Sequence, residues 1–142
     1  MAKVRFHYAD VKLIPLKKKR DVKEFVATIF QQEGKGLREL NYIFCSDDYL
    51  LNINRSFLNH DYFTDIVTFD LSEGEETEGE IYISIDRVKD NAVSHGASSA
   101  DELLRVMFHG ALHLLGYKDK KKSEITIMRQ KEDYYLRLFA AK

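Results

Sequence analysis

Alternating apolar and polar side chains predict four strands along the chain. Residues 4–10 (VRFHYAD) and 40–46 (LNYIFCS) repeat with the period of two that marks a strand with one buried face. Residues 65–72 and 79–86 share this period and are separated by a short acidic segment, EGEETE. The second pair is therefore predicted to form an antiparallel hairpin.

Apolar residues three and four positions apart predict helices between the strands. Asp21 and Glu24 have the spacing of a capping box, and the apolar face that follows them ends at Gly34. Ser46, followed by two aspartates, predicts the start of a helix that runs to about Phe57.

The second half of the chain predicts three more helices. Asp86 is the expected cap of the first, which ends near Ser94. Ser99 with Glu102 forms a second capping box, before the apolar helix DELLRVMFHGALHLL that Gly116 ends. The tail from residue 123 is amphipathic, and its expected core contacts are Ile125, Met128, Tyr135 and Phe139.

This order of elements predicts an α/β (α+β) fold, with a mixed central sheet of about four strands covered by helices. The 142 residues are enough for one domain, expected to span residues 1–142, with a sizeable core. The chain has one cysteine, Cys45, and no apolar run near the roughly 20 residues that cross a bilayer. These features exclude a disulfide framework and a thiolate metal site, and predict a cytoplasmic protein.

Charge is unevenly distributed, although the net charge is only −1. Residues 1–46 contain ten basic and five acidic side chains, and residues 103–142 contain nine and four. Residues 47–102 contain three basic and fourteen acidic ones. Solvated faces would explain this pattern, but a basic patch would form if the two ends of the chain met in space.

The stretch HGALHLLGYKD, residues 109–119, carries candidate metal chemistry. His109 and His113 leave the same face of a helix at i and i+4, with their Cβ atoms about 6 Å apart. Gly116 allows the chain to reverse and present Asp119 as a third ligand. Two nitrogens and one oxygen would leave a fourth position for water, as in a catalytic zinc site with one Zn²⁺ per chain. The alternative is two packed histidines and an aspartate in a turn.

Two neighbouring features narrow the chemistry. Zinc peptidases with HExxH place a glutamate directly after the first histidine as general base, but this chain has Gly110 there. Glycine cannot move a proton, so proteolysis is disfavoured while metal-assisted hydrolysis stays open. The segment KDKKK, residues 118–122, would attract a polyanion such as RNA, and KKKR at 17–20 could extend that track. Solvent-facing lysine loops are the plainer interpretation.

These residues resemble the YbeY family of bacterial metal-dependent endoribonucleases. HGALHLLGYKD is similar to the family's HGxLHLLGYDH, and TDIVTF (64–69) resembles its TDVLSF. GEIYISID (79–86) and MRQKED (128–133) resemble its LGDIxI strand and its M-x-x-x-E segment. The resemblance covers about residues 40–135.

The resemblance implies a zinc ion, hydrolysis of single-stranded RNA, and roles in 16S rRNA 3′-end maturation and ribosome quality control. It also implies small-subunit partners and no membrane. By position, His109 and His113 match the first two metal ligands, and Asp119 stands where the family has a third histidine. Lys118 replaces a residue that is usually acidic in the family.

A family arginine that contacts phosphate matches Leu58 when the residues are counted back from Thr64 without a gap. Arg55 is the nearest substitute in a catalytic role, with an exposed helix residue as the alternative. Expected substrate contacts are Lys118, Lys120, His60 and Thr64; His60 could also be a plain loop residue, and Thr64 a cap at the start of a strand.

The sequence therefore favours a zinc-dependent single-strand endoribonuclease acting on rRNA. A ribosome-associated assembly factor with a mainly structural metal and little cleavage activity is the alternative.

Overall fold

A computed structural model describes residues 3–142 of the chain, and within them the strands form one mixed four-stranded sheet. The strands lie in the order β1-β2-β4-β3. The first three of these are mutually parallel, and β3 pairs antiparallel with β4, which confirms the predicted hairpin. The strands are β1 (Val4–Tyr8), β2 (Leu37–Cys45), β3 (Ile66–Asp70) and β4 (Thr77–Ser84).

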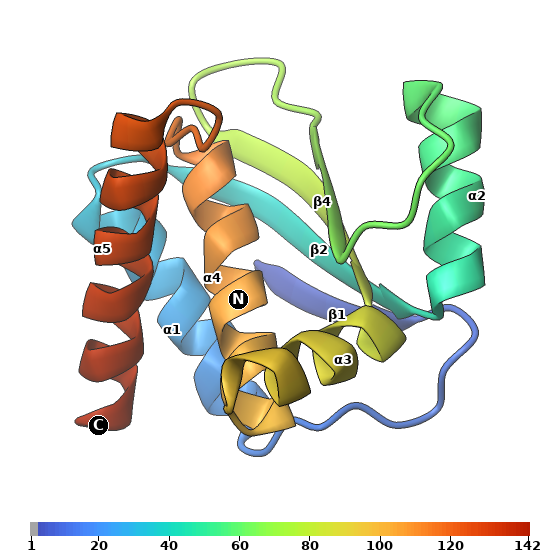
Figure 1. Ribbon diagram of the computed structural model, residues 1–142. Helices are drawn as coiled ribbons and strands as arrows, with labels where there is room; N and C mark the ends of the chain where they lie inside the picture. The colour runs from blue at the N-terminus through green and yellow to red at the C-terminus, as the bar shows by residue number, and fades with distance from the viewer. Residues whose placement is uncertain (1–2) are drawn as a thin grey trace.

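Helices cover both faces of this sheet (Figure 1). Three of them, α1, α4 and α5, lie together on one side, while α2 packs against β3 and β4 on the other. In the described part of the chain, the helices are α1 (Lys19–Gln32), α2 (Asp47–Leu58), α3 (Ile85–His95), α4 (Ser99–Leu114) and α5 (Lys122–Ala140). The predicted α/β class and mixed sheet are therefore confirmed.

The main hydrophobic core lies between the sheet and the three-helix side. Phe25 of α1 joins the helices, because its ring packs against Phe108 of α4 and against Tyr135 and Phe139 of α5. The net-basic segments 1–46 and 103–142 thus meet in space. A smaller cluster around Cys45, Leu50 and Val67 lies under α2.

Helix α4 approaches the sheet closely because glycines stand at the contact. A Cβ on Gly79 of β4 would lie 2.8 Å from Leu114 Cδ1 and 3.0 Å from the carbonyl oxygen of Phe69. A Cβ on Gly110 of α4 would lie 2.9 Å from side-chain atoms of both Ile66 and Ile81. Both contacts fix how near the histidines of α4 come to β3 and β4.

Three of the predicted helix caps are wrong. The capping box at Asp21 and Glu24 does not form, because α1 begins earlier and Lys18, in the left-handed conformation, precedes it. Helix α3 is capped by Ser84 instead of Asp86, and α4 by Ser98 instead of Ser99.

These cap errors have a common cause. For α3 and α4, a serine one or two positions earlier than predicted accepts the capping hydrogen bond, and α1 begins without a side-chain cap. Neighbouring residues that could each cap a helix look equivalent in the sequence. The cap at Ser46 is confirmed, since its hydroxyl accepts from the amide of Tyr49. Among the expected core contacts of α5, Ile125 is 47% exposed, which is a further error.

Candidate metal centre

Three side chains from the end of α4 and the loop after it converge on one point. The Nε2 atoms of His109 and His113 are 3.0 Å apart. Asp119 Oδ2 lies 3.2 Å from the first of these nitrogens and 3.3 Å from the second. The sequence predicted this set, and within residues 3–142 it is the group of potential ligands close enough to hold one metal ion.

The triangle of these three atoms has the size of one face of a zinc tetrahedron. Ligand atoms about 2.05 Å from a tetrahedral zinc ion lie roughly 3.3 Å from one another. The three separations of 3.0–3.3 Å therefore already suit a single small cation, with one coordination position left over. Asp119 takes part because Gly116, at φ 104°, lets the chain reverse after α4.

Hydrogen bonds on the other ring nitrogens orient both imidazoles. His109 Nδ1 lies 2.6 Å from Glu132 Oε2, and His113 Nδ1 lies 3.0 Å from the backbone carbonyl oxygen of Tyr117. Both partners are acceptors, so each Nδ1 carries a proton and each Nε2 is left to face the centre. A cation placed between the two Nε2 atoms and the Asp119 carboxylate oxygen would take all three as ligands.

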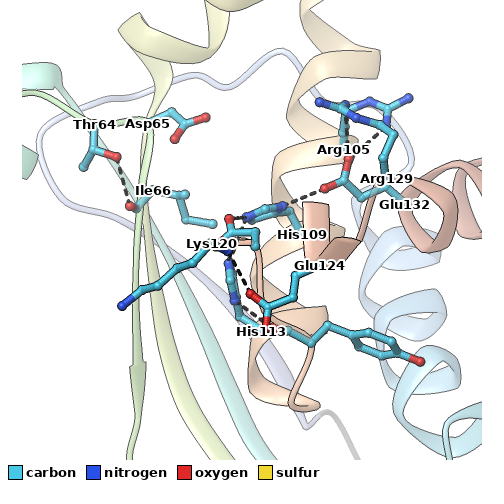
Figure 2. Close-up of polar contacts among 12 residues, drawn as sticks. Thr64, Asp65, Ile66, Arg105, His109, His113, Lys120, Glu124, Arg129 and Glu132 are labelled. Carbon is cyan, nitrogen blue, oxygen red and sulfur yellow. Dashed lines mark hydrogen bonds and ion pairs between the residues drawn. The ribbon is translucent and has the colours of Figure 1, made fainter. Parts of the chain in front are cut away.

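Glu132 of α5 connects this centre to two arginines. Only 5% of its side chain is exposed, and Oε1 accepts from Arg105 (2.8 Å) and Arg129 (3.3 Å) (Figure 2). Burial alone would raise the pKa of Glu132, but the hydrogen bonds from His109 and Arg105 outweigh burial and keep its pKa below the ordinary value. The carboxylate is thus held ionised, as an acceptor for His109 must be.

A second carboxylate braces the loop that carries Tyr117. Glu33, which caps the C-terminus of α1, accepts from the hydroxyl of Tyr117 (2.6 Å) and from Lys131 (3.1 Å). It also accepts from the hydroxyl of Tyr135. Burial would raise the pKa of Glu33, but these hydrogen bonds lower it overall. Because the Tyr117 carbonyl holds His113, Glu33 indirectly fixes the second histidine.

A cleft of about 330 Å³ opens beside the ligands, between α4, α5 and the start of β3. Asp65 lines it, across from His109 (Figure 2), and Asn91 Nδ2 donates to Asp65 Oδ2 over 3.3 Å. Burial raises the pKa of Asp65, an effect that the charge of His109 opposes. Arg105 and Arg129 are the guanidinium groups in the lining, which also contains Glu102.

The other predicted site residues lie outside this lining. Lys118 and Lys120 are exposed on the loop that presents Asp119. Thr64 directly precedes Asp65, and its hydroxyl donates to the carbonyl oxygen of Ile66 (3.4 Å). Arg55 forms an ion pair with Asp61 near the end of α2, and His60 stacks on Tyr62 in the loop towards β3.

Gly110, which argued against a peptidase, has a packing role here. Its missing side chain admits Ile66 and Ile81 against α4. A glutamate at this position, where HExxH peptidases carry their general base, would not fit between helix and sheet.

Sequence reasoning missed the groups that orient the ligands. Glu132 was visible only as part of the segment MRQKED, and Arg105 and Arg129 lack any motif of their own. Glu102 was interpreted as a cap, but it is buried and its Oε1 lies 3.2 Å from His95 Nδ1. Besides that segment, the signal that could have found Glu132 is an acid on the apolar face of an amphipathic helix, about three turns from its start.

Fold and site together define an α/β protein with a histidine–carboxylate cluster that could hold a metal ion at the end of one helix. Residues 6–140 match the family model described as endoribonuclease YbeY. The chain belongs to this family, as the resemblance of its motifs indicated.

Individual relatives match this chain in sequence over most of its length. The endoribonuclease YbeY of Cytophaga hutchinsonii is 51% identical over 134 residues, which are 94% of each chain. That of Flavobacterium psychrophilum is 50% identical over 118 residues, covering 83% of this chain and 84% of the relative. The solution structure of TM1509 from Thermotoga maritima has a TM-score of 0.68 at 29% identity, over 96% of this chain and 88% of the other.

Proposed function

We propose that this protein is a zinc-dependent endoribonuclease that cuts single-stranded RNA. Membership of an endoribonuclease family supplies the reaction class, the hydrolysis of RNA phosphodiester bonds. The convergence of two imidazole nitrogens and one carboxylate oxygen within 3.0–3.3 Å of one another is the observation that carries the metal dependence.

Each residue of the centre has a distinct role in this proposal. His109, His113 and Asp119 hold the metal, while Glu132 and the Tyr117 carbonyl accept from the Nδ1 atoms and so turn each Nε2 towards it. Zinc, when bound, supplies a Lewis acid that lowers the pKa of water to about 7. Asp65 faces the same cleft and can orient a water or accept a hydrogen bond from it.

RNA contacts follow from the position of the basic side chains. Lys118 and Lys120 flank Asp119 and would bind the sugar-phosphate backbone on the exposed side of the loop. Thr64 stands at the edge of the cleft, next to Asp65. Arg55 and His60 lie further out, so a catalytic role for Arg55 requires its ion pair with Asp61 to open.

The biological substrate in this proposal is the 3′ end of 16S rRNA, with the small ribosomal subunit as partner. Its support is the family resemblance of the motifs. Within residues 3–142 no helix combines the length and the apolarity needed to cross a bilayer.

The test combines metal analysis with cleavage. Protein purified with zinc supplied should contain about one zinc per chain, and a single-stranded RNA should be cut faster than the same RNA in a duplex. His113→Ala should lose zinc and cleavage together. A metal content near zero in wild type would contradict the proposal.

The same variant separates the enzyme from an assembly factor with a structural metal. If His113→Ala stays folded and cells carrying it still produce mature 16S rRNA ends, cleavage is not the role of this protein. If unprocessed rRNA accumulates while ribosome binding persists, the enzymatic role stands. A peptidase is tested with an unfolded protein substrate, which should remain intact where RNA is cut.

A further inference from the structure

The cleft beside the metal ligands contains two guanidinium groups with very different surroundings. Arg105 is held by two acids: Nη1 lies 2.8 Å from Glu132 Oε1, and Nη2 lies 2.7 Å from Asp133 Oδ1. Its side chain is 25% exposed. Arg105 is therefore a fixed structural cation whose charge is already matched.

Arg129 is engaged far less. Its side chain is 56% exposed, and among residues 3–142 its guanidinium makes a single hydrogen bond, from Nη1 to Glu132 Oε1 over 3.3 Å. A guanidinium has five N–H donors in a planar fork, so four of them can serve a ligand. The negative charge of Glu132 is also shared with Arg105 and His109, which leaves the charge of Arg129 incompletely matched.

The position of Arg129 relates it directly to the metal centre. One carboxylate stands between them, because Glu132 Oε1 accepts from Arg129 while its Oε2 binds His109 Nδ1. Figure 2 shows the guanidinium of Arg129 on one side of the histidines and the Nζ of Lys120 on the opposite side. An RNA strand bound across the metal centre would therefore meet a cationic side chain on each side of it.

We propose that Arg129 forms a subsite for an RNA phosphate next to the bond that is cut. The guanidinium fork matches two phosphate oxygens, which a lysine ammonium does not. Glu132 accepts one hydrogen bond from the guanidinium of Arg129, which positions the group and leaves its other N–H donors for a phosphate. This inference rests on the proposed function and names the part of the RNA that the cleft recognises.

The test compares Arg129→Ala with Arg137→Ala, which removes the same charge from an exposed position about two turns further along α5. Zinc-loaded proteins are titrated with a labelled single-stranded oligonucleotide of 2′-O-methyl RNA over a range of salt concentrations. Arg129→Ala should bind about tenfold or more weakly. The plot of log affinity against log salt concentration should become less steep by about 0.7, which corresponds to the loss of one phosphate contact. Arg137→Ala should change neither value.

Oligonucleotides with one uncharged methylphosphonate locate the contact. Wild type should lose affinity at one linkage in particular, and Arg129→Ala should be insensitive at that same linkage. Arg129→Lys should recover the salt slope but only part of the affinity, because it keeps the charge and loses the fork.

Three results would overturn the inference. Equal affinity and equal salt slope in Arg129→Ala and Arg137→Ala, with wild type still cutting RNA, would remove the subsite and leave the proposed function intact. A fall in zinc affinity equal to the fall in RNA affinity would make Arg129 a positioning residue that acts through Glu132. Failure of zinc-loaded wild type to bind or cut RNA would overturn the proposed function itself.

Discussion

At the scale of single residues, the orientation of each histidine depends on an acceptor from outside the ligand set. Glu132 comes from α5, and the carbonyl of Tyr117 comes from the loop that also carries Asp119. Metal-bound histidines in general depend on such partners for tautomer and basicity. The proposed ligands were predictable from their spacing in the sequence, whereas the groups that orient them could be identified only from the fold.

Replacing Glu132 with glutamine should weaken zinc binding by roughly 10- to 100-fold, because the amide is a weaker acceptor for His109 Nδ1–H. Asp133→Asn is the matched control, since Asp133 contacts Arg105 and not the histidine. Competition with a chelating dye measures both affinities. Equal zinc affinity in Glu132→Gln and Asp133→Asn would show that the orienting carboxylate has no influence on the metal.

At the scale of elements, the packing of α4 on β4 sets the position of the ligands. Gly79 and Gly110 allow the helix to lie close to the strand, with Leu114 and Ile81 filling the contact. This contact explains why the glycines stand inside regular elements, where they are otherwise unfavourable.

Gly79→Ala should therefore lower the free energy of unfolding by about 1–3 kcal/mol, because its Cβ would press on Leu114 and on the rigid carbonyl of Phe69. Gly74→Ala is the matched control: nothing lies within 4 Å of its Cβ, and the change should stay within about 0.5 kcal/mol. Urea unfolding of the three proteins gives these values. A Gly79→Ala protein as stable as wild type would mean that α4 can shift freely on the sheet.

The strands and helices were predictable because their apolar periods are long and regular. The hairpin of β3 and β4 and the burial of Met128 and Tyr135 follow directly from such periods. Cap positions were not predictable to the residue, since Ser98 and Ser99 offer the same hydroxyl and only the backbone conformation separates them. The exposure of Ile125 depends on the angle at which α5 docks, which a period does not encode.

At the scale of the whole molecule, polar contacts connect parts of the chain that are far apart in sequence. Glu33 joins the C-terminus of α1 to Tyr117 and to Lys131 and Tyr135 of α5. The three elements around the metal centre are thus coupled through one carboxylate. Its loss would loosen the site without touching a ligand.

The lowered pKa of Glu33 makes a pH-dependent contribution to stability. The fold favours the ionised form, so the stabilisation is fully present above the ordinary glutamate value of 4.5 and is lost as the pH falls through the lower folded pKa. Glu33→Gln should therefore cost about 1–2 kcal/mol at neutral pH, and progressively less as the pH falls below 4.5. Urea titrations at several pH values measure the difference, and a cost independent of pH would contradict this account.

Zinc should stabilise the whole fold through the site. At a free concentration about a hundred times its Kd, a ligand that binds only the folded chain adds about 2.7 kcal/mol to the free energy of unfolding. The melting temperature of wild type should rise on addition of zinc and return on addition of a chelator, while that of His113→Ala should not respond. An equal rise in both proteins would place the bound zinc elsewhere.

All three proposed ligands lie within residues 109–119, so they are made close together during synthesis and remain close in the denatured chain. A nascent or unfolded polypeptide can consequently retain some affinity for a divalent ion, which subtracts from the stabilisation that the folded site provides. The carboxylate of Glu132, which orients His109, lies on α5 and is synthesised later. The oriented set of three side chains is therefore complete only after α5 has packed against α4.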